Sequence, residues 1–440
     1  MPKLKQLAGL KNEYMQCLRE KGAEAIIPHF ENGLRIYNEY LKTLQALQES
    51  QAQLNRLSEQ FNKTRDKSLI EQSKETKARI TAMQAKVDAL AAEIQKIEVV
   101  LPNWIAEGVP RAKGDENELP LKYSGIPKVW KNHEAEFLEL YPDAKYSVQE
   151  DEPFHHYDLV GNLVDQERAG EIAQSRFYYQ FDELVPLDLA IGLYALEFFR
   201  KKGYADRMMI PPFIMRRDVE ERITYFEAFQ DTIFEIERDG LLLTPSSEHS
   251  IIAYYANTIF EPEQLPLRVA AWSPCFRREA GAHGKDTRGI FRVKQFQKVE
   301  LHSFLKEGED FAEIDRITQD VQEFMDTLGL PNRSVVVPSG EMDKRALKQV
   351  DVQVWMPGQG RFRETHSIAT LGTWVSEKML LRYRKGTEKE LVRNVYATGI
   401  AVQRIICAIA ENHYSPEGNS IRVPKPLQKY LDFSEIPLKK

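Results

Sequence analysis

One segment of the chain, Phe276–Glu300, concentrates residue types that could bind a charged and planar ligand. Its sequence, FRREAGAHGKDTRGIFRVKQFQKVE, has two strand-like pieces on either side of a loop rich in glycine and cations. In a strand, every second side chain lies on the same face. An aromatic ring on that face could stack on a planar ligand while cations and a carboxylate meet its charged groups. The second piece places five such residues on one face: Lys294, Phe296, Lys298, Glu300 and His302.

A solvated hairpin with balanced charge fits the same segment, and the familiar chemical motifs do not decide between the two interpretations. Residues 281–287 look like a phosphate loop but lack the GxxxxGK[ST] spacing that lets successive amides wrap a phosphate. Residues 358–360 form a GxG without a third glycine that opens a helix, so a dinucleotide-binding fold is not supported. The nine histidines are scattered, and the adjacent His155 and His156 fit a surface or core detail better than a metal site.

The composition is that of a globular protein with enough apolar residues for a sizeable core. The 440 residues are 42% hydrophobic and 29% charged, and the net charge of -6 excludes a uniformly basic nucleic-acid coat, although not a local basic patch. The three cysteines are far apart, so they predict neither a disulfide framework nor a CxxC-type zinc site. The start lacks the apolar core of a secretory signal, and Asp188 and Glu197 interrupt the most apolar stretch. We therefore expect a cytoplasmic protein with no membrane span.

A long stretch, Glu31–Leu101, predicts two helices. It contains a single glycine and no proline, and it is rich in Gln, Glu, Lys, Ala and Leu. Apolar residues recur every seven positions in its first half, and the polar segment Asn62–Ser68 is the expected reversal point. We expect an antiparallel coiled-coil hairpin with arms of roughly 45 to 50 Å, at 1.5 Å per residue. In the second half the apolar seam has alternating spacings of three and four: Ile80, Met83, Val87, Leu90, Ile94, Ile97 and Leu101.

Residues 111–128 are rich in Pro, Gly and charge, and we expect them to link an N-terminal domain at 1–110 to a second domain at 129–440. In the second domain a helix-like run, Val185–Lys202, leads into a short apolar run, Met208–Ile210. This mixture predicts an α+β or an α/β fold, and the residues alone leave both open. Later runs are strand-like by length and by β-branched or aromatic content: Leu267–Phe276, Val293–Phe304 and Val350–Trp355.

Three motifs in the second domain resemble the signature motifs of class II aminoacyl-tRNA synthetases, in the form found in the seryl-tRNA synthetase family. Phe276–Glu300 resembles the second motif, GIAVQR at 399–404 followed by AIAEN resembles the third, and Pro211-Pro212 after a helix and a short strand resembles the first. That family also has an N-terminal coiled-coil arm, a Leu-Pro-Asn exit from it and a tail similar to VPKPLQKYL, so the resemblance covers nearly the whole chain. It implies an α+β fold, in which helices flank an antiparallel β-sheet catalytic domain that follows an N-terminal antiparallel coiled-coil arm.

The resemblance implies ATP and Mg²⁺ as cofactors. Activation of an amino acid brings its carboxylate to the α-phosphate of ATP, and two anions require fixed positive charge. Arg277 would bind the α-phosphate and the carboxylate, and Arg292 and Arg404 would bind the outer phosphates; Arg277 and Arg404 are the expected catalytic residues. Phe296 would stack on adenine, and Glu279 would accept a hydrogen bond from its amino group. The full set expected at ATP is Arg277, Arg278, Glu279, Arg292, Val293, Phe296, Glu364, Thr365, His366, Ser367 and Arg404, with Glu364 and Ser367 as the oxygen ligands of Mg²⁺.

The resemblance also implies a pocket for L-serine beside ATP, in which Glu300 engages the substrate. Two of its positions depart from the family pattern, because Ser246 replaces a threonine and Tyr396 replaces an asparagine; the stretch 366–378 also lacks two arginines of the family. A phenol in place of a small amide changes pocket volume and hydrogen bonding together. The ATP positions therefore match the family better than the serine positions do. The expected lining is Ser246, Ser247, Glu248, Glu300, Tyr396 and Thr398.

As partners, the resemblance implies a second copy in a homodimer and tRNA(Ser), gripped by the arm, with tRNA(Sec) as an additional candidate acceptor. An ordinary solvated coiled-coil surface or a protein-partner site fits the arm's charges as well. Two alternatives remain for the whole chain: a paralogue that activates another small amino acid or loads another acceptor, and a catalytically silent RNA-binding homologue. The basic residues that would contact RNA phosphates cluster toward the expected tip: Arg56, Lys63, Arg65, Lys67, Lys74, Lys77 and Arg79.

Overall fold

The computed structural model describes residues 2–226, 230–279, 286 and 288–438. The chain divides into two compact units, Met1–Trp104 and Ile105–Lys440. Within the described part of the chain, no helix combines the length and the apolar character needed to cross a membrane.

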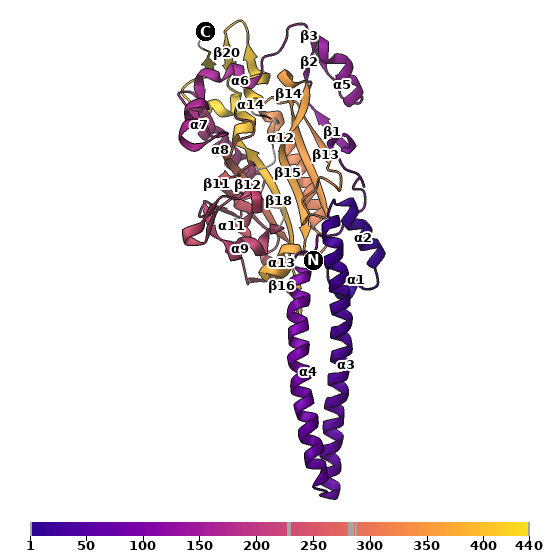
Figure 1. The fold of residues 1–440 in the computed structure, drawn as a ribbon. Helices are drawn as coiled ribbons and strands as arrows, with labels where there is room; N and C mark the ends of the chain where they lie inside the picture. Colours follow the sequence, from indigo (N-terminus) through magenta and orange to yellow (C-terminus); the bar gives the residue numbers. More distant parts are fainter. Residues whose placement is uncertain (1, 227–229, 280–285, 287, 439–440) are drawn as a thin grey trace. The chain divides into compact units, whose positions relative to one another are not determined.

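The N-terminal unit is built on a hairpin of two long helices, α3 (Ile27–Thr64) and α4 (Ser68–Glu98) (Figure 1). The chain reverses inside the expected segment. There Arg65 adopts a left-handed φ of 59°, and the Asp66 carboxylate accepts the backbone N–H of Ser68 at 2.9 Å. The expected antiparallel hairpin of helices is present, and α3 begins four residues earlier than expected.

Along the predicted seam Val87, Leu90, Ile97 and Leu101 are buried, whereas Ile80, Met83 and Ile94 are half-buried. Gly33, the single glycine of the stretch, is a buried residue of α3. A Cβ at this position would lie 2.8 Å from Cγ2 of Ile97 and 3.2 Å from both methyl carbons of Leu4. A larger residue would push these side chains away, because helix packing at such distances leaves no free volume.

The second unit is organised on one eight-stranded sheet (Figure 1). Its strand order is β1-β13-β14-β15-β18-β12-β11-β6, and among these strands only β6 and β11 pair in parallel. Of the two fold classes left open by the residues, the structure is therefore α+β, as the family resemblance implied. The strands are β1 (Leu119–Ser124), β6 (Arg207–Met209), β11 (Leu267–Phe276), β12 (Gln295–Leu305), β13 (Asn332–Val336), β14 (Lys348–Met356), β15 (Arg361–Gly372) and β18 (Arg393–Ala401).

The strand-like and helix-like runs of the sequence match elements of this unit within two residues at each end. The expected linker, 111–128, differs from the structure, because it contains β1, an edge strand paired with β13. Its Leu119 and Leu121 are 47% and 49% exposed, so the strand lacks the alternation of buried residues that marks a strand in sequence.

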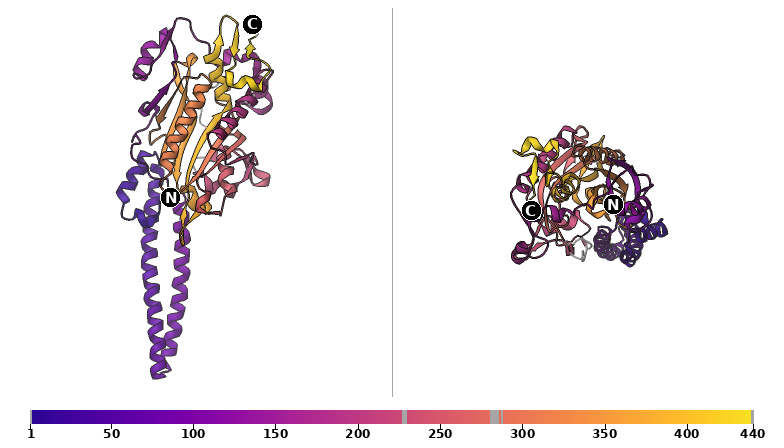
Figure 2. Two further views of the ribbon diagram at one scale, coloured as in Figure 1. Left: turned by 180° about the vertical axis from the view of Figure 1, so that it is seen from behind. Right: turned by 90° about the horizontal axis from the view of Figure 1, so that it is seen from above.

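Three helices cover one face of the sheet: α8 (Leu184–Lys201), α12 (Asp310–Thr327) and α14 (Val402–His413). The odd-numbered side chains of β12 point to this face, where Ser303 Oγ donates to Glu313 Oε1 of α12 at 2.7 Å. The left view of Figure 2 shows α12 in front of the strands. The even-numbered side chains of β12 consequently point to the opposite face of the sheet.

Smaller elements complete the two units. The helices are α1 (Leu4–Leu7), α2 (Lys11–Glu20), α5 (Glu134–Leu140), α6 (His156–Leu159), α7 (Glu167–Ala173), α9 (Arg217–Ile223), α11 (Ser247–Tyr254) and α13 (Trp374–Met379). The short strands are β2 (Lys128–Trp130), β3 (Ser147–Gln149), β4 (Val164–Asp165), β5 (Tyr179–Gln180), β7 (Ile214–Arg216), β8 (Glu235–Ile236), β9 (Leu241–Leu243), β10 (Ile259–Phe260), β16 (Arg382–Lys385), β17 (Glu388–Leu391), β19 (Tyr414–Ser415), β20 (Ser420–Arg422) and β21 (Glu435–Pro437).

Candidate active site

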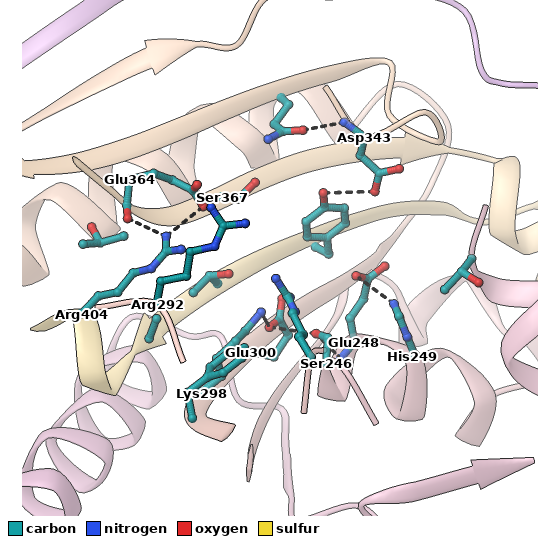
Figure 3. Close-up of a pocket in the computed structure, with 18 of the residues that line it drawn as sticks. Ser246, Glu248, His249, Arg292, Lys298, Glu300, Asp343, Glu364, Ser367 and Arg404 are labelled. Carbon is teal, nitrogen blue, oxygen red and sulfur yellow. Dashed lines mark hydrogen bonds and ion pairs between the residues drawn. The ribbon is translucent and has the colours of Figure 1, made fainter. Parts of the chain in front are cut away.

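A cavity of about 470 Å³ lies on the face of the sheet opposite α12, and it brings most of the expected site residues together (Figure 3). Strands β12, β15 and β18 contribute side chains to it, as do the loop after β11, the start of α11 and the loop between β13 and β14. Fourteen of the seventeen expected residues line it: Ser246, Glu248, Arg277, Glu279, Arg292, Val293, Phe296, Glu300, Glu364, Thr365, Ser367, Tyr396, Thr398 and Arg404.

One part of the cavity carries the cations and the ring expected at the nucleotide. Arg277 follows β11, and its guanidinium carbon lies 5.4 Å from the ring centre of Phe296 on β12. Arg404 lies in the first turn of α14, where its Nη1 donates to the backbone carbonyl oxygen of Glu364 at 2.6 Å. Guanidinium groups in one cavity suit a polyphosphate, and the ring beside Arg277 suits a purine base.

Two residues expected to hold different parts of ATP bind each other in this structure. The Nε of Arg292 donates to Oε2 of Glu279 at 2.5 Å. Glu279 has a left-handed φ of 53°, so the backbone turns sharply where its side chain leaves the loop. This ion pair occupies Nε of Arg292 and Oε2 of Glu279, so these two atoms are not available to a nucleotide while the pair is closed.

Two side chains on β15 offer oxygen atoms that could bind a metal ion, the carboxylate of Glu364 and the hydroxyl of Ser367. They lie near Arg292 and Arg404 in the cavity (Figure 3). The Glu364 side chain is 48% exposed, and its Oε1 lies 3.4 Å from Nη1 of Arg404. The described residues contain no group of three or more His, Cys, Asp or Glu side chains that could hold a metal ion by themselves. This donor set fits Mg²⁺, which binds through one or two protein oxygens and completes its shell with water and substrate phosphates.

Glu300 lies on β12, farther along the cavity, and it is buried. It forms an ion pair with Lys298 on the same strand face, and its Oε2 accepts a hydrogen bond from the hydroxyl of Ser246 at 3.3 Å. Burial raises the pKa of Glu300, and the positive charge of Lys298 offsets only part of this effect. A carboxyl group in this state can hydrogen-bond to a hydroxyl group of a small ligand.

Glu248, the second buried carboxylate, lies in the first turn of α11. Its Oε1 accepts a hydrogen bond from Nη1 of Arg345 at 3.0 Å. Burial alone would raise the pKa of Glu248, but the charges of Arg345 and His249 outweigh burial and hold the pKa below its ordinary value. Glu248 is therefore an anion in the folded protein, and an anion at this position suits a ligand ammonium group.

Tyr396 on β18 lines the cavity. Its hydroxyl donates to Oδ2 of Asp343 at 3.3 Å. Burial, together with the neighbouring charges of Asp343 and Glu248, raises the pKa of Tyr396 well above its ordinary value, so the phenol is neutral. The residue that departs most from the family pattern is thus part of the pocket wall.

Among the residues that the structure describes, three expected site residues lie outside the cavity lining. The Arg278 side chain is exposed, and its backbone N–H donates to the carbonyl oxygen of Thr232 at 2.7 Å. Ser247, the first residue of α11, is fully buried. His366 is also fully buried, with Nδ1 2.8 Å from Oγ1 of Thr365, and burial lowers its pKa to about 3. Each neighbours a residue of the cavity in sequence, but its own side chain points elsewhere.

Two residues expected on the same strand face as Phe296 are also outside the described lining. Lys294 precedes β12, and its Nζ lies 5.8 Å from the ring centre of Phe177. His302 is buried deeper along β12, with Nε2 3.2 Å from Oδ1 of Asn394. Residues 281–285 and 287, in the glycine-rich loop of this segment, fall outside the described residues.

The sequence analysis missed one complete wall of the cavity, the segment Glu341–Arg345. It also missed Phe291, whose ring centre lies 5.1 Å from the guanidinium carbon of Arg404 and 4.7 Å from that of Arg363. The signal available for the missed wall was a pair of opposite charges, Asp343 and Arg345, just before a strand-like run. Such pairs are common on surfaces, so this one did not stand out.

Comparison with known proteins agrees with this architecture. Residues 233–413 match the family model described as the tRNA synthetase class II core domain (G, H, P, S and T). An antiparallel sheet that presents arginines, a phenylalanine and carboxylates to one cavity is thus the core of a class II aminoacyl-tRNA synthetase.

Relatives that match nearly the full length of the chain identify the family within this class. Serine–tRNA ligase from Pyrococcus horikoshii is 36% identical over 92% of this chain and 90% of its own, and that from Ignicoccus hospitalis is 36% identical over 92% and 91%. A crystal structure of seryl-tRNA synthetase from Pyrococcus horikoshii complexed with ATP matches with a TM-score of 0.94 and 34% identity, over all of both chains. The cytoplasmic serine–tRNA ligase from Naegleria fowleri in complex with AMP matches with a TM-score of 0.83 and 25% identity, over 97% of this chain and 96% of its own. The chain belongs to the serine–tRNA ligase family.

Proposed function

We propose that this chain activates L-serine with ATP and transfers the seryl group to tRNA(Ser). The observation that carries the proposal is the division of one cavity into a part with three arginines and a ring and a part with two buried carboxylates. The first part suits ATP, and the second suits the ammonium and hydroxyl groups of serine. Family membership supports the same assignment.

In the first step, a carboxylate oxygen of serine attacks the α-phosphorus of ATP. A new O–P bond forms, the bond from the α-phosphorus to the bridging oxygen breaks, and pyrophosphate leaves with the electron pair. Arg277 would offset the charge of both anions as they approach. Protein side chains act here by positioning and charge, and none forms a covalent bond with the substrate.

In the second step, a ribose hydroxyl at the 3′ end of tRNA attacks the carbonyl carbon of seryl adenylate. The ester bond to the tRNA forms, the bond from the carbonyl carbon to the phosphate oxygen breaks, and AMP leaves; the hydroxyl proton passes to the departing phosphate. Glu248 would hold the serine ammonium group and Glu300 its hydroxyl during both steps.

ATP binding would rearrange the ion pair between Arg292 and Glu279. Arg292 would turn to the outer phosphates beside Arg404, which leaves Glu279 to accept a hydrogen bond from the adenine amino group. Phe296 would stack on the base. Glu364 and Ser367 would hold Mg²⁺, which supplies positive charge to the phosphates when it is bound.

The arm would bind the tRNA through its basic tip. All seven basic residues expected at the tip are exposed in the structure, so each is accessible to a phosphate. Contacts of this kind recognise the shape of RNA and weaken as salt rises.

A homodimer is proposed for the second unit, with an apolar stripe on α8 as part of the interface. Val185, Leu189 and Leu193 follow one another at intervals of four, which places them on one helix face, and they are 44%, 56% and 53% exposed. Contiguous exposed apolar groups of this kind mark interaction surfaces. The place of action we propose is the cytoplasm, where tRNA is charged.

Pyrophosphate exchange into ATP, measured with each standard amino acid in turn, tests the proposed function. We expect serine to support the fastest exchange and Arg277→Ala to abolish it. Exchange led by another amino acid would contradict serine specificity and favour a paralogue. Absence of exchange with every amino acid would contradict activation altogether and favour a silent RNA-binding homologue.

A further inference from the structure

The Glu248 carboxylate is held by a side chain that the expected site did not include. Arg345 lies in the loop between β13 and β14, and its side chain is only 7% exposed. Its Nη1 donates to Oε1 of Glu248 at 3.0 Å, and its Nη2 donates to Oδ2 of Asp343 at 2.7 Å. Nη1 also donates to the carbonyl oxygen of Ile223 at the end of α9, at 3.0 Å. One planar guanidinium therefore fixes three segments of the cavity wall in a single geometry.

Asp343 and Tyr396 keep this guanidinium in place. Asp343 accepts hydrogen bonds from Arg345 and from the Tyr396 hydroxyl, and its backbone N–H donates to Oε1 of Gln349 at 2.9 Å. The Tyr396 ring centre lies 5.7 Å from the guanidinium carbon of Arg345. Arg345 cannot turn away from Glu248 without breaking its hydrogen bonds to Asp343.

Several charged groups surround Glu248. Two carboxylates, those of Glu248 and Asp343, hydrogen-bond to the single guanidinium of Arg345. The anionic Glu248 carboxylate suits a substrate ammonium group. Charged or titratable groups from every element packed here act on Glu248 or on its partners: Glu220 (α9), His249 (α11), Glu300 and His302 (β12), Asp343 and Arg345 (loop), Lys378 (α13) and Tyr396 (β18).

We propose that Arg345 is a positioning residue for the amino acid, which fixes the Glu248 carboxylate where it accepts the substrate's α-ammonium group. The proposal rests on the proposed function, in which this part of the cavity binds serine. A carboxylate already held in one orientation needs no reorganisation when the ammonium group arrives. Because Arg345 acts through Glu248, its removal weakens amino acid binding and leaves ATP binding intact.

The test is pyrophosphate exchange by the full chain carrying Arg345→Gln or Arg345→Lys, with KM for serine, KM for ATP and kcat measured from pH 6 to 9. Arg345→Gln is expected to raise KM for serine by at least about tenfold, while KM for ATP and kcat change by less than about threefold. Arg345→Lys keeps the charge but removes the planar fork, so KM for serine rises here too.

The pH profile separates positioning from a general structural role. In Arg345→Gln, burial is no longer outweighed by the guanidinium charge, so the pKa of Glu248 rises. The acid limb of kcat/KM for serine therefore moves to higher pH in Arg345→Gln and stays in place in Arg345→Lys. An acid limb that does not move in Arg345→Gln would overturn the proposal.

Arg333→Gln is the matched control, because Arg333 also forms a buried ion pair, with Glu118 at 2.7 Å, and lies outside the cavity lining that the structure describes. It is expected to lower the melting temperature without a change in KM for serine. The proposal is overturned if Arg345→Gln behaves like this control, or if it changes both KM values by the same factor.

A variant with a smaller perturbation covers the case in which Arg345→Gln does not fold. Asp343→Asn preserves volume but removes one of the two carboxylates that hold the guanidinium. KM for serine is expected to rise about threefold or more with KM for ATP unchanged, and an unchanged KM for serine would overturn the proposal.

The unaltered chain separates failure of this proposal from failure of the proposed function. If another amino acid supports exchange, only serine specificity fails. The role of Arg345 is then tested with that amino acid, because it also has an α-ammonium group, and its KM is compared between the variants and the unaltered chain. If no amino acid supports exchange, both fail.

Discussion

At the scale of single residues, the nucleotide part of the cavity depends on a ring and a guanidinium that already lie together. The guanidinium carbon of Arg277 lies 5.4 Å from the ring centre of Phe296, and both residues line the cavity. A base that enters beside them would stack on the phenylalanine ring, and such stacking contributes about 1 to 3 kcal/mol per base. The stacking energy belongs to ATP alone, because serine has no aromatic ring.

Substitution of Phe296 tests this separation. In Phe296→Ala we expect KM for ATP to rise by roughly 5- to 150-fold, the factor that corresponds to removal of the stacking energy, with KM for serine changed much less. Phe296→Tyr keeps the ring and serves as the control in the same exchange assay. A KM for ATP that does not change in Phe296→Ala would rule out stacking of the base on this ring.

At the scale of elements, α8 and α14 meet through a buried polar contact next to the cavity. Nε2 of Gln403, the residue before Arg404, donates to Oδ2 of Asp188 at 2.7 Å. Asp188 is only 6% exposed, and burial raises its pKa to about 6 from an ordinary value of 3.8. Between these two pH values the folded chain binds more protons than the unfolded chain, so stability falls as pH rises through this window.

Replacement of Asp188 by its neutral isostere tests the cost of this buried charge. Asp188→Asn keeps an oxygen that accepts from Gln403 and removes the charge, so at pH 8 we expect the free energy of unfolding to increase by about 1 to 3 kcal/mol. The increase should shrink as the pH is lowered toward 5, because Asp188 of the unaltered chain then becomes protonated in the folded state.

Urea unfolding at both pH values provides the measurement, and Asp143→Asn at an exposed position is the control. A difference between Asp188→Asn and the unaltered chain that is the same at pH 8 and pH 5 would contradict the raised pKa.

At the scale of the whole molecule, RNA binding and adenylate formation are proposed for two separate compact units. The tip of the hairpin presents exposed cations such as Lys63 and Lys67, whereas the cavity lies entirely in the second unit. Changes at the tip should therefore alter tRNA binding and leave amino acid activation as it is.

The double variant Lys63→Gln and Lys67→Gln tests this division. We expect weaker tRNA binding and a plot of log affinity against log salt whose slope falls by about 1 for each lysine that no longer binds a phosphate. Filter binding across a salt series provides the slope, and Lys42→Gln, farther from the reversal on the same helix, is the control. Pyrophosphate exchange should be unchanged, and reduced exchange would contradict the separation of the two functions.

The proposed dimer is a second property of the whole molecule. Leu189→Asp combined with Leu193→Asp places two charges on the exposed stripe of α8, so we expect monomers in sedimentation velocity where the unaltered chain sediments as a dimer. Leu138→Asp, which charges a leucine that is 46% exposed on α5, should leave the dimer intact. A double variant that still sediments as a dimer would show that the interface lies elsewhere.

The sequence by itself determined the features that contiguous residues encode. The heptad spacing of the seam predicted the hairpin, and the polar segment Asn62–Ser68 contains its turn. Strand alternation brought Phe296, Lys298 and Glu300 to one face, and all three line the cavity. These predictions hold because periods of 2.0 and 3.6 residues are properties of local backbone geometry.

The tertiary structure alone decided which separate segments meet at the cavity. Arg345 and Glu248 are 97 positions apart, and they pair because the β13–β14 loop and the start of α11 meet at the cavity. A shift in the β14–β15 register at Thr365 turns this side chain toward the cavity, and the next residue, His366, is buried away from it. Strand order, register shifts and loop positions depend on contacts between distant residues, and such contacts leave no periodic signal in the sequence.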